Sequence, residues 1–312
     1  MLGLGAALCA RHSNSLQLMP LASTSHHEFS KRSAWWPTGG KISLSMVQDS
    51  DADTAEGAAG LYQKFSEHAW QKLEVSGLFQ AADLPSELRT NVAPAKGTKD
   101  SVVRISTKAM IPTTESEPIV RYARVALLET ISESSEEKIQ SDGIQVLNFV
   151  VIPSDSTSLP VLGIDLVSLP GNRHLLLLDA QPMAHPNPFE DRWRSWHETF
   201  VGGCPHFPWG GDFPEPVQQY VSKHTLWTRL QEQENPVPII QNQVWDAFVA
   251  HLDLYLELLN ECKNDPTKVQ GGNHQPGYLE YRRNNDPAKP MLNSLYGGEW
   301  TERVLDEVLF PQ

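Results

Sequence analysis

A series of apolar segments joined by short connections, in the middle of the chain, constrains the fold more than any other feature. Five segments rich in Val, Ile and Leu are expected to be strands: 102–110, 119–129, 143–152, 161–169 and 174–180. The last three are separated by connections too short to hold a helix. Because parallel pairing needs a crossover of about a dozen residues or more, we expect these strands to be antiparallel neighbours.

Residues with helical spacing lie on both sides of this strand region. An apolar stripe repeats every four positions over about 58–75, at Leu61, Phe65, Ala69 and Leu73. Later stripes comprise Val244, Phe248, His251, Leu252, Tyr255 and Leu259 in one long helix, and Trp300, Val304, Leu305 and Val308 near the C-terminus. Residues 80–100, with two prolines and a glycine, are expected to be irregular. Strands that are apolar on both faces need cover on both sides, so we predict an α+β protein: a three-layer α/β/α sandwich with a central antiparallel β-sheet.

The first 48 residues differ in composition from the rest. They contain four basic residues and one acidic residue and are rich in Ser, Ala and Leu, which is typical of organelle transit peptides. The alternative is a disordered tail without a targeting role. We predict a disordered plastid-targeting leader at 1–48, an acidic linker at 49–57 and a single domain at 58–312, located in the chloroplast stroma.

Composition and motifs exclude several classes of protein and site. The formal net charge of -13 argues against a general nucleic-acid binder, and no apolar run reaches the roughly 18–20 residues of a membrane span. Three cysteines without a Cys-x-x-Cys pair predict neither a disulfide framework nor a zinc site. The chain has no glycine motif for phosphates or dinucleotides and no His/Cys cluster with metal-ligand spacing. We expect a monomer that binds neither nucleic acid nor membrane and holds no metal.

Three polar residues interrupt the apolar strands, namely Asn148, Asp165 and Asp179. A symmetric loop at 153–160 would place Asn148 opposite Asp165, and a turn centred on Asn172 would place Asp165 opposite Asp179, so that all three project to one face. Gly163 would leave space above the sheet for a flat ligand. The group is either a buried structural cluster or a pocket with a proton-donating carboxylate whose pKa is raised by burial.

A further acid, Asp286, precedes Pro287 in the segment YRRNNDPAKP. An Asp-Pro pair is by itself a turn signal. Arg282 and Arg283 could pair with carboxylates of a substrate or could be solvated surface charge.

Three segments together resemble the ferredoxin-dependent bilin reductases. They are LPVLGIDLVSLPGNRHLLLLDAQP, PHFPWGGDFPEPVQQYVSKHTLWTRLQEQE and NNDPAKPMLNSLYGGEWTERVLDEVLF. The middle segment is similar to the phycoerythrobilin:ferredoxin oxidoreductase branch in particular. The resemblance covers roughly residues 60–312 and implies an α/β/α sandwich with the bilin between the sheet and the C-terminal helices.

The resemblance also implies a chemistry. Reduced ferredoxin, a [2Fe-2S] protein, would deliver electrons singly through radical intermediates, with no cofactor bound in the enzyme. The branch implies a two-electron reduction of the A-ring diene system of 15,16-dihydrobiliverdin to phycoerythrobilin. An upstream bilin reductase is a further candidate partner. The alternatives are a sister reductase that acts on biliverdin and a non-catalytic bilin carrier.

Matching positions imply roles for individual residues. Asp165 corresponds to a proton donor on the central strand, and Asp286 to an acid on the C-terminal side of the pocket, so both are predicted to be catalytic. The predicted substrate-binding residues are Asn148, Arg229, Arg283, His174 and Gln181. Asn148 stands where the phycocyanobilin-forming branch has histidine, and Ala126 where that branch has glutamate. A local basic patch should dock the acidic ferredoxin, with Lys223, Arg282, Arg283 and Lys289 as candidates.

Overall fold

An antiparallel sheet of eight strands forms the middle layer of the protein, whose computed structural model describes residues 60–96, 100–113, 118–132, 143–231, 235–265, 275–286 and 288–311. The strand order is β1-β3-β4-β5-β6-β7-β8, and β2 also pairs with β3. The strands are β1 (Phe79–Ala81), β2 (Thr90–Pro94), β3 (Ser101–Pro112), β4 (Val120–Ser132), β5 (Gln145–Pro153), β6 (Val161–Leu169), β7 (Arg173–Gln181) and β8 (Leu226–Leu230). Neighbours in sequence are neighbours in space from β3 to β8, as the short connections predict.

The five predicted strands are confirmed, whereas the expectation of an irregular segment at 80–100 is wrong. That segment contains β2 and the one-turn helix α2 (Ser86–Arg89). Most β2 side chains are not buried, so its sequence lacks an apolar pattern, and its backbone pairing with β3 determines its conformation. The edge strand β8 was not expected either, because it is only five residues long.

One face of the sheet is covered by α1 (Gln63–Val75), α3 (Arg194–Phe200) and α5 (Trp245–Asn264). A 3₁₀ turn (Glu190–Trp193) precedes α3, and a π-helical turn (Ile239–Val244) precedes α5. The predicted apolar stripes of α1 and α5 are confirmed, because Phe65, Leu73, Phe248 and Tyr255 are fully buried. They pack with Phe149 and its neighbours on the sheet into one apolar core.

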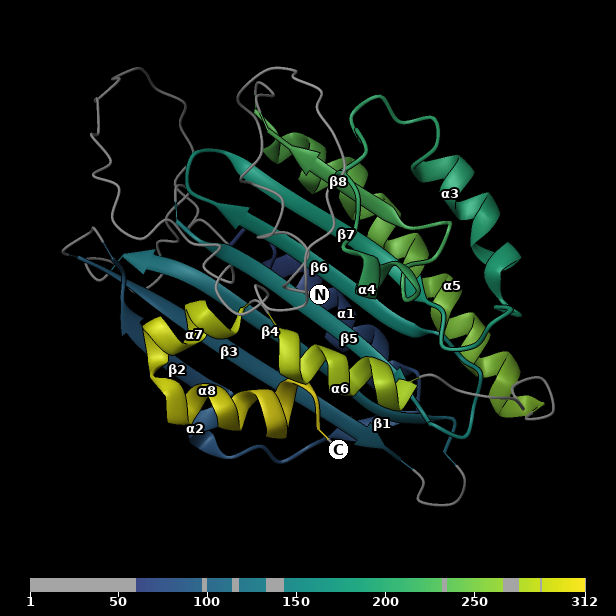
Figure 1. Cartoon of the computed structure of the whole chain (residues 1–312), viewed down its shortest axis with the longest axis horizontal. Helices are drawn as coiled ribbons and strands as arrows, with labels where there is room; N and C mark the ends of the chain where they lie inside the picture. The colour runs from purple at the N-terminus through teal and green to yellow at the C-terminus, as the bar shows by residue number, and fades with distance from the viewer. Residues whose placement is uncertain are drawn as a thin grey trace, which may run out of the picture.

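The opposite face is covered by α2, α4 (Glu215–Gln218), α6 (Gln275–Asn285), α7 (Lys289–Tyr296), α8 (Gly298–Val304) and the π-helical turn Leu305–Leu309. In Figure 1 the yellow α6, α7 and α8 lie in front of the sheet, and the purple α1 lies behind it. Tyr278, Leu292 and Val304 anchor these helices in a second core. The sheet therefore lies between two helical layers, and the predicted α/β/α sandwich is confirmed.

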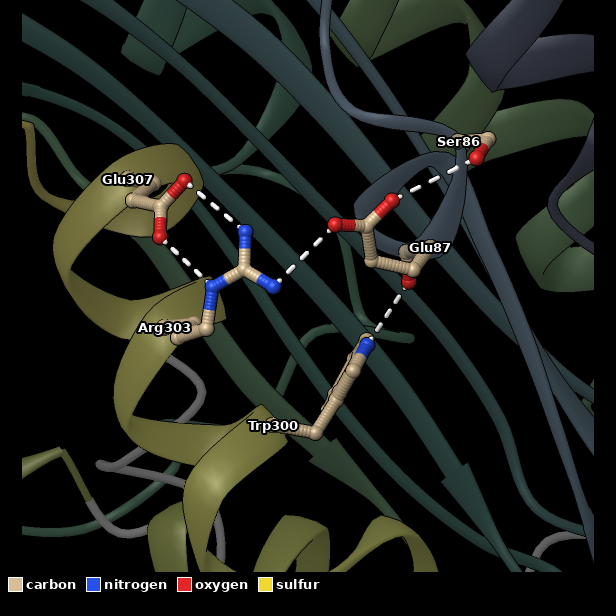
Figure 2. Close-up of polar contacts among 5 residues, drawn as sticks. All are labelled: Ser86, Glu87, Trp300, Arg303 and Glu307. Atoms are coloured by element: carbon tan, nitrogen blue, oxygen red, sulfur yellow. Dashed lines mark hydrogen bonds and ion pairs between the residues drawn. The ribbon is translucent and has the colours of Figure 1, made fainter.

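Polar contacts fix the C-terminal layer to the β1–β2 edge of the sheet. Arg303 of α8 forms ion pairs with Glu307, at 2.8 Å, and with Glu87 of α2, at 3.1 Å (Figure 2). The Trp300 indole N–H donates to the Glu87 carbonyl at 2.8 Å, and the Ser86 hydroxyl donates to the Glu87 carboxylate at 3.3 Å. Residues far apart in sequence thus hold one end of the cover in place.

The predicted leader (1–48) and linker (49–57) lie outside the described residues. Of the helices that the structure describes, none combines the length and apolar character needed to cross a membrane. Cys204 and Cys262 are free thiols.

Candidate functional site

A row of directly opposed residues crosses the sheet on the face covered by α6–α8. Ala126, Asn148, Asp165, Leu177 and Trp227 follow one another from β4 to β8. The predicted pairing of Asn148 with Asp165 is confirmed. Since opposed residues project to the same face, the carboxyl of Asp165 points toward the C-terminal layer, beside the Asn148 amide.

The predicted pairing of Asp165 with Asp179 is wrong. Asp165 pairs with Leu177, and Asp179 pairs with Gly163. The turn between β6 and β7 closes one residue earlier than expected, centred on Gly171, whose φ of 82° suits a residue without a Cβ. The resulting shift is two residues, which preserves the face, so Asp179 still lies on the same side of the sheet as Asp165.

Asp165 is almost completely buried, with 4% of its surface exposed. Burial and the negative charge of Asp286 raise its pKa well above that of an ordinary aspartate, while the Asn148 amide and the Arg124 guanidinium lower it. Burial is the largest of these effects, so the neutral acid is the favoured form. A protonated carboxyl in a buried site can act as a general acid.

Asp286 follows the last residue of α6, and its side chain is 1% exposed. One carboxylate oxygen lies 3.1 Å from Nη2 of Arg282, and the other accepts a hydrogen bond from the Ala288 backbone N–H at 2.8 Å. Its effect on the pKa of Asp165 requires that the two carboxyls lie within electrostatic range. The sheet and the helical layer therefore each contribute one buried acid to the same interface.

Arg124 on β4 links these groups, and the sequence analysis missed it. Its guanidinium is buried, donates to the side-chain oxygen of Asn148 and donates to the Leu309 carbonyl at 2.9 Å. Burial lowers its pKa, and the negative charges of Asp286 and Asp165 act in the opposite direction. A charged residue inside an apolar strand was the signal that identified Asp165, and the same signal was present in VRYARVALLE.

A second polar group adjoins the first around Tyr278 of α6, whose pKa is raised by burial. Gln181 and Asp179, from the sheet, and Asp286 all influence this hydroxyl. Asp179 is fully buried and accepts hydrogen bonds from the Ser222 backbone N–H, at 3.1 Å, and from the Ser222 hydroxyl. Burial raises the pKa of Asp179 to about 7, and the bonds from Ser222 oppose the shift.

Several buried polar atoms in this interface have no hydrogen-bond partner among the described residues. They are Oδ1 of Asp165, Nδ2 of Asn148, both amide atoms of Gln181 and Nε of Arg282. Asn148 and Gln181 lie close enough to Asp165 and Tyr278 to affect their pKa values, but their amides do not reach ordinary hydrogen-bond geometry. Buried polar groups are normally paired, so this concentration is what a binding site for a polar ligand would show.

Two hollows lie on either side of Arg124 along β4. One is a narrow crevice, with about 10 Å³ for a water-sized sphere, whose apolar lining includes Ala126, Met291 and Leu309. The other has about 690 Å³ of empty space, part of it open to solvent, and its lining includes Arg121 and Arg283. The acid cluster thus lies between an apolar space and one lined by charged side chains of both signs.

The sequence profile of the family described as ferredoxin-dependent bilin reductase matches residues 131–311, which is more than half of the chain. This chain belongs to the ferredoxin-dependent bilin reductases. It is therefore an oxidoreductase, and the matched residues include Asn148, Asp165, Asp179 and Asp286.

Curated relatives carry the name phycoerythrobilin:ferredoxin oxidoreductase. That of Prochlorococcus marinus subsp. pastoris is 39% identical over 176 residues, which cover 55% of this reductase and 68% of the relative. That of Gloeobacter violaceus is 34% identical over 220 residues, or 68% of this chain and 82% of the relative. A crystal structure of tomato phytochromobilin synthase in complex with biliverdin shares the fold, with a TM-score of 0.61 and 18% identity over 80% of this chain and 82% of that one.

The structure does not bring His174 to the acid cluster of the reductase. His174 lies on β7 next to Leu175, so alternation directs it to the face covered by α1 and α5. There it contacts the Ser168 hydroxyl at 2.7 Å, which in turn contacts the Tyr62 hydroxyl at 2.7 Å. A ligand bound over Asp165 cannot touch it, and a structural role is the simpler interpretation.

The other predicted binding residues lie on the face of Asp165. Gln181 belongs to the polar group around Tyr278. Arg229 is half-buried on β8, with its guanidinium 5.7 Å from the centre of the Trp227 ring. Arg283 forms an ion pair with Asp306 beside the larger hollow. Arg282, proposed above for surface docking, is only 5% exposed and pairs with Asp286, so that expectation is wrong.

Proposed function

We propose that this reductase uses electrons from ferredoxin to convert 15,16-dihydrobiliverdin to phycoerythrobilin by a two-electron reduction of the A-ring diene system. The shared name of the relatives, which specifies phycoerythrobilin and ferredoxin, supports this substrate class. The single observation that carries the mechanism is that Asp165 on the sheet and Asp286 beside α6 are both buried in the interface between these two layers.

The substrate is a flat conjugated tetrapyrrole with two propionates. It needs an apolar slot, polar contacts for its pyrrole and carbonyl groups, and cations for its carboxylates. The row around Asp165 would form one wall and α6 with Asp286 the other. Both acids are 4% exposed, so substrate entry has to displace part of the cover formed by α6 and the C-terminal segment.

The reaction consumes two electrons and two protons. Each electron from reduced ferredoxin increases the basicity of the bilin, and a neutral carboxyl beside it can then transfer a proton. Asp165 is the proposed first donor, and Asn148 and Arg124 stabilise the carboxylate that remains. Asp286 is the proposed route of the second proton: its carboxylate, which Arg282 holds, takes up a proton from water and passes it to the bilin. The first electron and proton give a bilin radical. The second electron and proton convert this radical to phycoerythrobilin.

Ferredoxin is acidic and has to dock near cationic side chains. Lys223 and Lys289 are available at the surface, where they pair with Glu190 and Glu302, and Arg283 is half-buried near the C-terminus. Turnover should decrease as salt rises toward 0.15 M, because screening acts beyond about 8 Å at that ionic strength. Salt-independent turnover would contradict an electrostatic dock.

The reaction can be tested by anaerobic incubation with reduced ferredoxin and either 15,16-dihydrobiliverdin or biliverdin, with products identified by absorbance and chromatography. We expect phycoerythrobilin from the dihydro compound. Turnover of biliverdin alone would indicate the sister reductase. Binding of either pigment without any ferredoxin-driven spectral change would indicate the carrier.

The location and assembly of the reductase are also proposals. We propose a plastid enzyme whose residues 1–48 are removed on import, because that segment is basic and nearly free of acids. A fluorescent protein fused behind residues 1–48 should accumulate in chloroplasts, and cytosolic fluorescence would contradict this. Sedimentation should show a monomer, and a complex with an upstream bilin reductase would appear as a faster species when both are mixed.

A further inference from the structure

The larger of the two hollows lies between the start of β4 and the outer side of α6. Its empty space is about 690 Å³, and its lining includes Arg121, Asp155, Leu279, Glu280, Arg283 and Pro311. It is separate from the polar cluster around Asp165. The β4 member of that cluster, Arg124, lies three residues further along the strand than Arg121. Arg121 and Arg283 share this space and influence one another, since the charge of Arg283 lowers the pKa of Arg121.

Arg121 is placed there by an irregularity in the sheet. The register of β4 against β5 shifts between Val120 and Tyr122, which is where Arg121 leaves the regular alternation. Its side chain is half-buried, and its Nη2 is buried with no hydrogen-bond partner among the described residues. Burial lowers the pKa of Arg121, and the negative charge of the exposed Asp155 raises it. Among the described residues, Arg121 forms no ion pair within 4 Å, with Asp155 or with any other acid. A guanidinium in this state lacks the anion that usually accompanies it.

Arg283 is held in position by the end of the chain. Its Nε lies 3.3 Å from the Asp306 carboxylate, and its Nη2 donates to the Phe310 carbonyl at 2.6 Å. These contacts orient the guanidinium toward the hollow before any ligand arrives, which reduces the entropy lost on binding. Two arginines with a solvent-connected space between them form a site for a carboxylate, because guanidinium groups match carboxylate geometry.

We infer that Arg121 and Arg283 form a carboxylate clamp that binds one propionate of the bilin, which rests on the proposed function. Arg121 precedes Arg124 by three residues on β4, or about 10 Å of extended chain. Arg283 follows Arg282, the partner of Asp286. A bilin bound between Asp165 and Asp286 can therefore reach the clamp with one propionate, which is a short flexible side chain. Asp155 and Glu280 line the same hollow, so a propionate would have to contact the arginines on the side away from these two acids.

The clamp is tested by titrating the protein with 15,16-dihydrobiliverdin and with its dimethyl ester, followed by absorbance without ferredoxin. Arg121→Gln should weaken binding of the free acid about tenfold, the effect of losing one charged hydrogen-bonded pair. Binding of the ester should be unchanged, since it has no carboxylate to lose. Arg121→Lys should retain part of the affinity. Arg283→Gln should also weaken binding of the free acid more than binding of the ester. It should in addition lose the contacts of Arg283 with the C-terminal segment.

The matched control is Arg192→Gln, because Arg192 lies on the opposite side of the sheet, where it pairs with Glu261. It should bind acid and ester as the wild type does. Equal weakening of acid and ester by Arg121→Gln would show a structural effect and overturn the clamp, as would no weakening of either. These outcomes leave the proposed function intact, whereas a wild-type protein that binds neither pigment overturns both.

Discussion

The two faces of the sheet are built from the same strands but differ in what they bury. The face under α1, α3 and α5 is a continuous apolar core, and its strand polar groups satisfy one another, as in the contact between Ser168 and His174. The face under α6–α8 buries Asp165, Asp179 and Arg124 from the strands alone. Several polar atoms on that face have no hydrogen-bond partner in the part of the chain that the structure describes, although the cover is in place.

The difference separates stability from chemistry within one fold. A buried carboxyl without complete hydrogen bonding destabilises the folded state, so a face that retains several of them has another use for them. The first face also contains the His251 imidazole, which has no hydrogen-bond partner among the described residues. Burial lowers its pKa to about 3, and it packs against the Trp196 ring at 4.5 Å as a neutral group. Mutations on the two faces should therefore affect different properties.

The largest effect is expected from Asp165→Asn, which removes the proposed proton donor and preserves shape. Turnover should decrease by about 10²–10⁴, the usual contribution of general acid catalysis. The pigment should still bind and accumulate as a radical detectable by electron paramagnetic resonance. Stability at pH 8 should be equal to or higher than that of the wild type, because the raised pKa of the acid means that its ionisation destabilises the fold. Product formation at the wild-type rate would contradict the assignment.

On the other face, Phe248→Ala should have the reverse profile. Phe248 is fully buried and packs edge-on against Phe65 at 5.1 Å, so its truncation should cost about 3–5 kcal/mol of unfolding free energy. Denaturant titration measures this loss. The fraction that remains folded should still reduce bilin at the normal rate. A selective loss of turnover with unchanged stability would break the distinction between the faces.

Asp179→Asn should change how stability depends on pH. The folded-state pKa of about 7 lies above the ordinary 3.8, so the folded protein binds the extra proton between these values. Stability from this group is therefore lost as pH rises from about 4 to 7, by a few kcal/mol at about 1.4 kcal/mol per unit. Thermal unfolding across this range should show a flatter profile for Asp179→Asn. Asp212→Asn, at an exposed acid, is the control and should retain the wild-type slope.

The smallest effect is expected from Arg303→Gln, at the α8–α2 contact of Figure 2. Its partners Glu87 and Glu307 are half-exposed, and such ion pairs contribute about 0–1 kcal/mol. Thermal unfolding should therefore barely change. If this edge anchors the cover, bilin release should nevertheless become faster in stopped-flow dilution. A stability loss of several kcal/mol would mean that the edge is part of the core.

Sequence alone predicted most of the sheet and half of the site. The short symmetric loop after β5 was enough to pair Asn148 with Asp165. The next register was missed because the conformation of Gly171, not loop length, sets it. His174 was misplaced although its position relative to Asp179 on one strand, five residues apart, already indicated the opposite face.

The proximity of Asp286 to Asp165 could not be calculated from local patterns. It depends on how α6 packs against strands that lie about a hundred residues earlier in the sequence. The resemblance to the family predicted that both acids share a pocket. The residues around Asp286 alone predicted only a turn at the Asp-Pro pair. Arg124 lies outside the three strands whose polar residues pointed to the site, so its link to Asn148 is visible only in the structure.

Infrared difference spectroscopy tests most directly whether acids from both layers meet the same pigment. Spectra of the protein with and without 15,16-dihydrobiliverdin, at neutral pH in H₂O and D₂O, report protonated carboxyls through their C=O stretch. We predict a carboxyl band that shifts on pigment binding, disappears in Asp165→Asn and changes in Asp286→Asn. A spectrum in which pigment binding alters no carboxyl band, or in which Asp286→Asn leaves every band unchanged, would contradict a shared site.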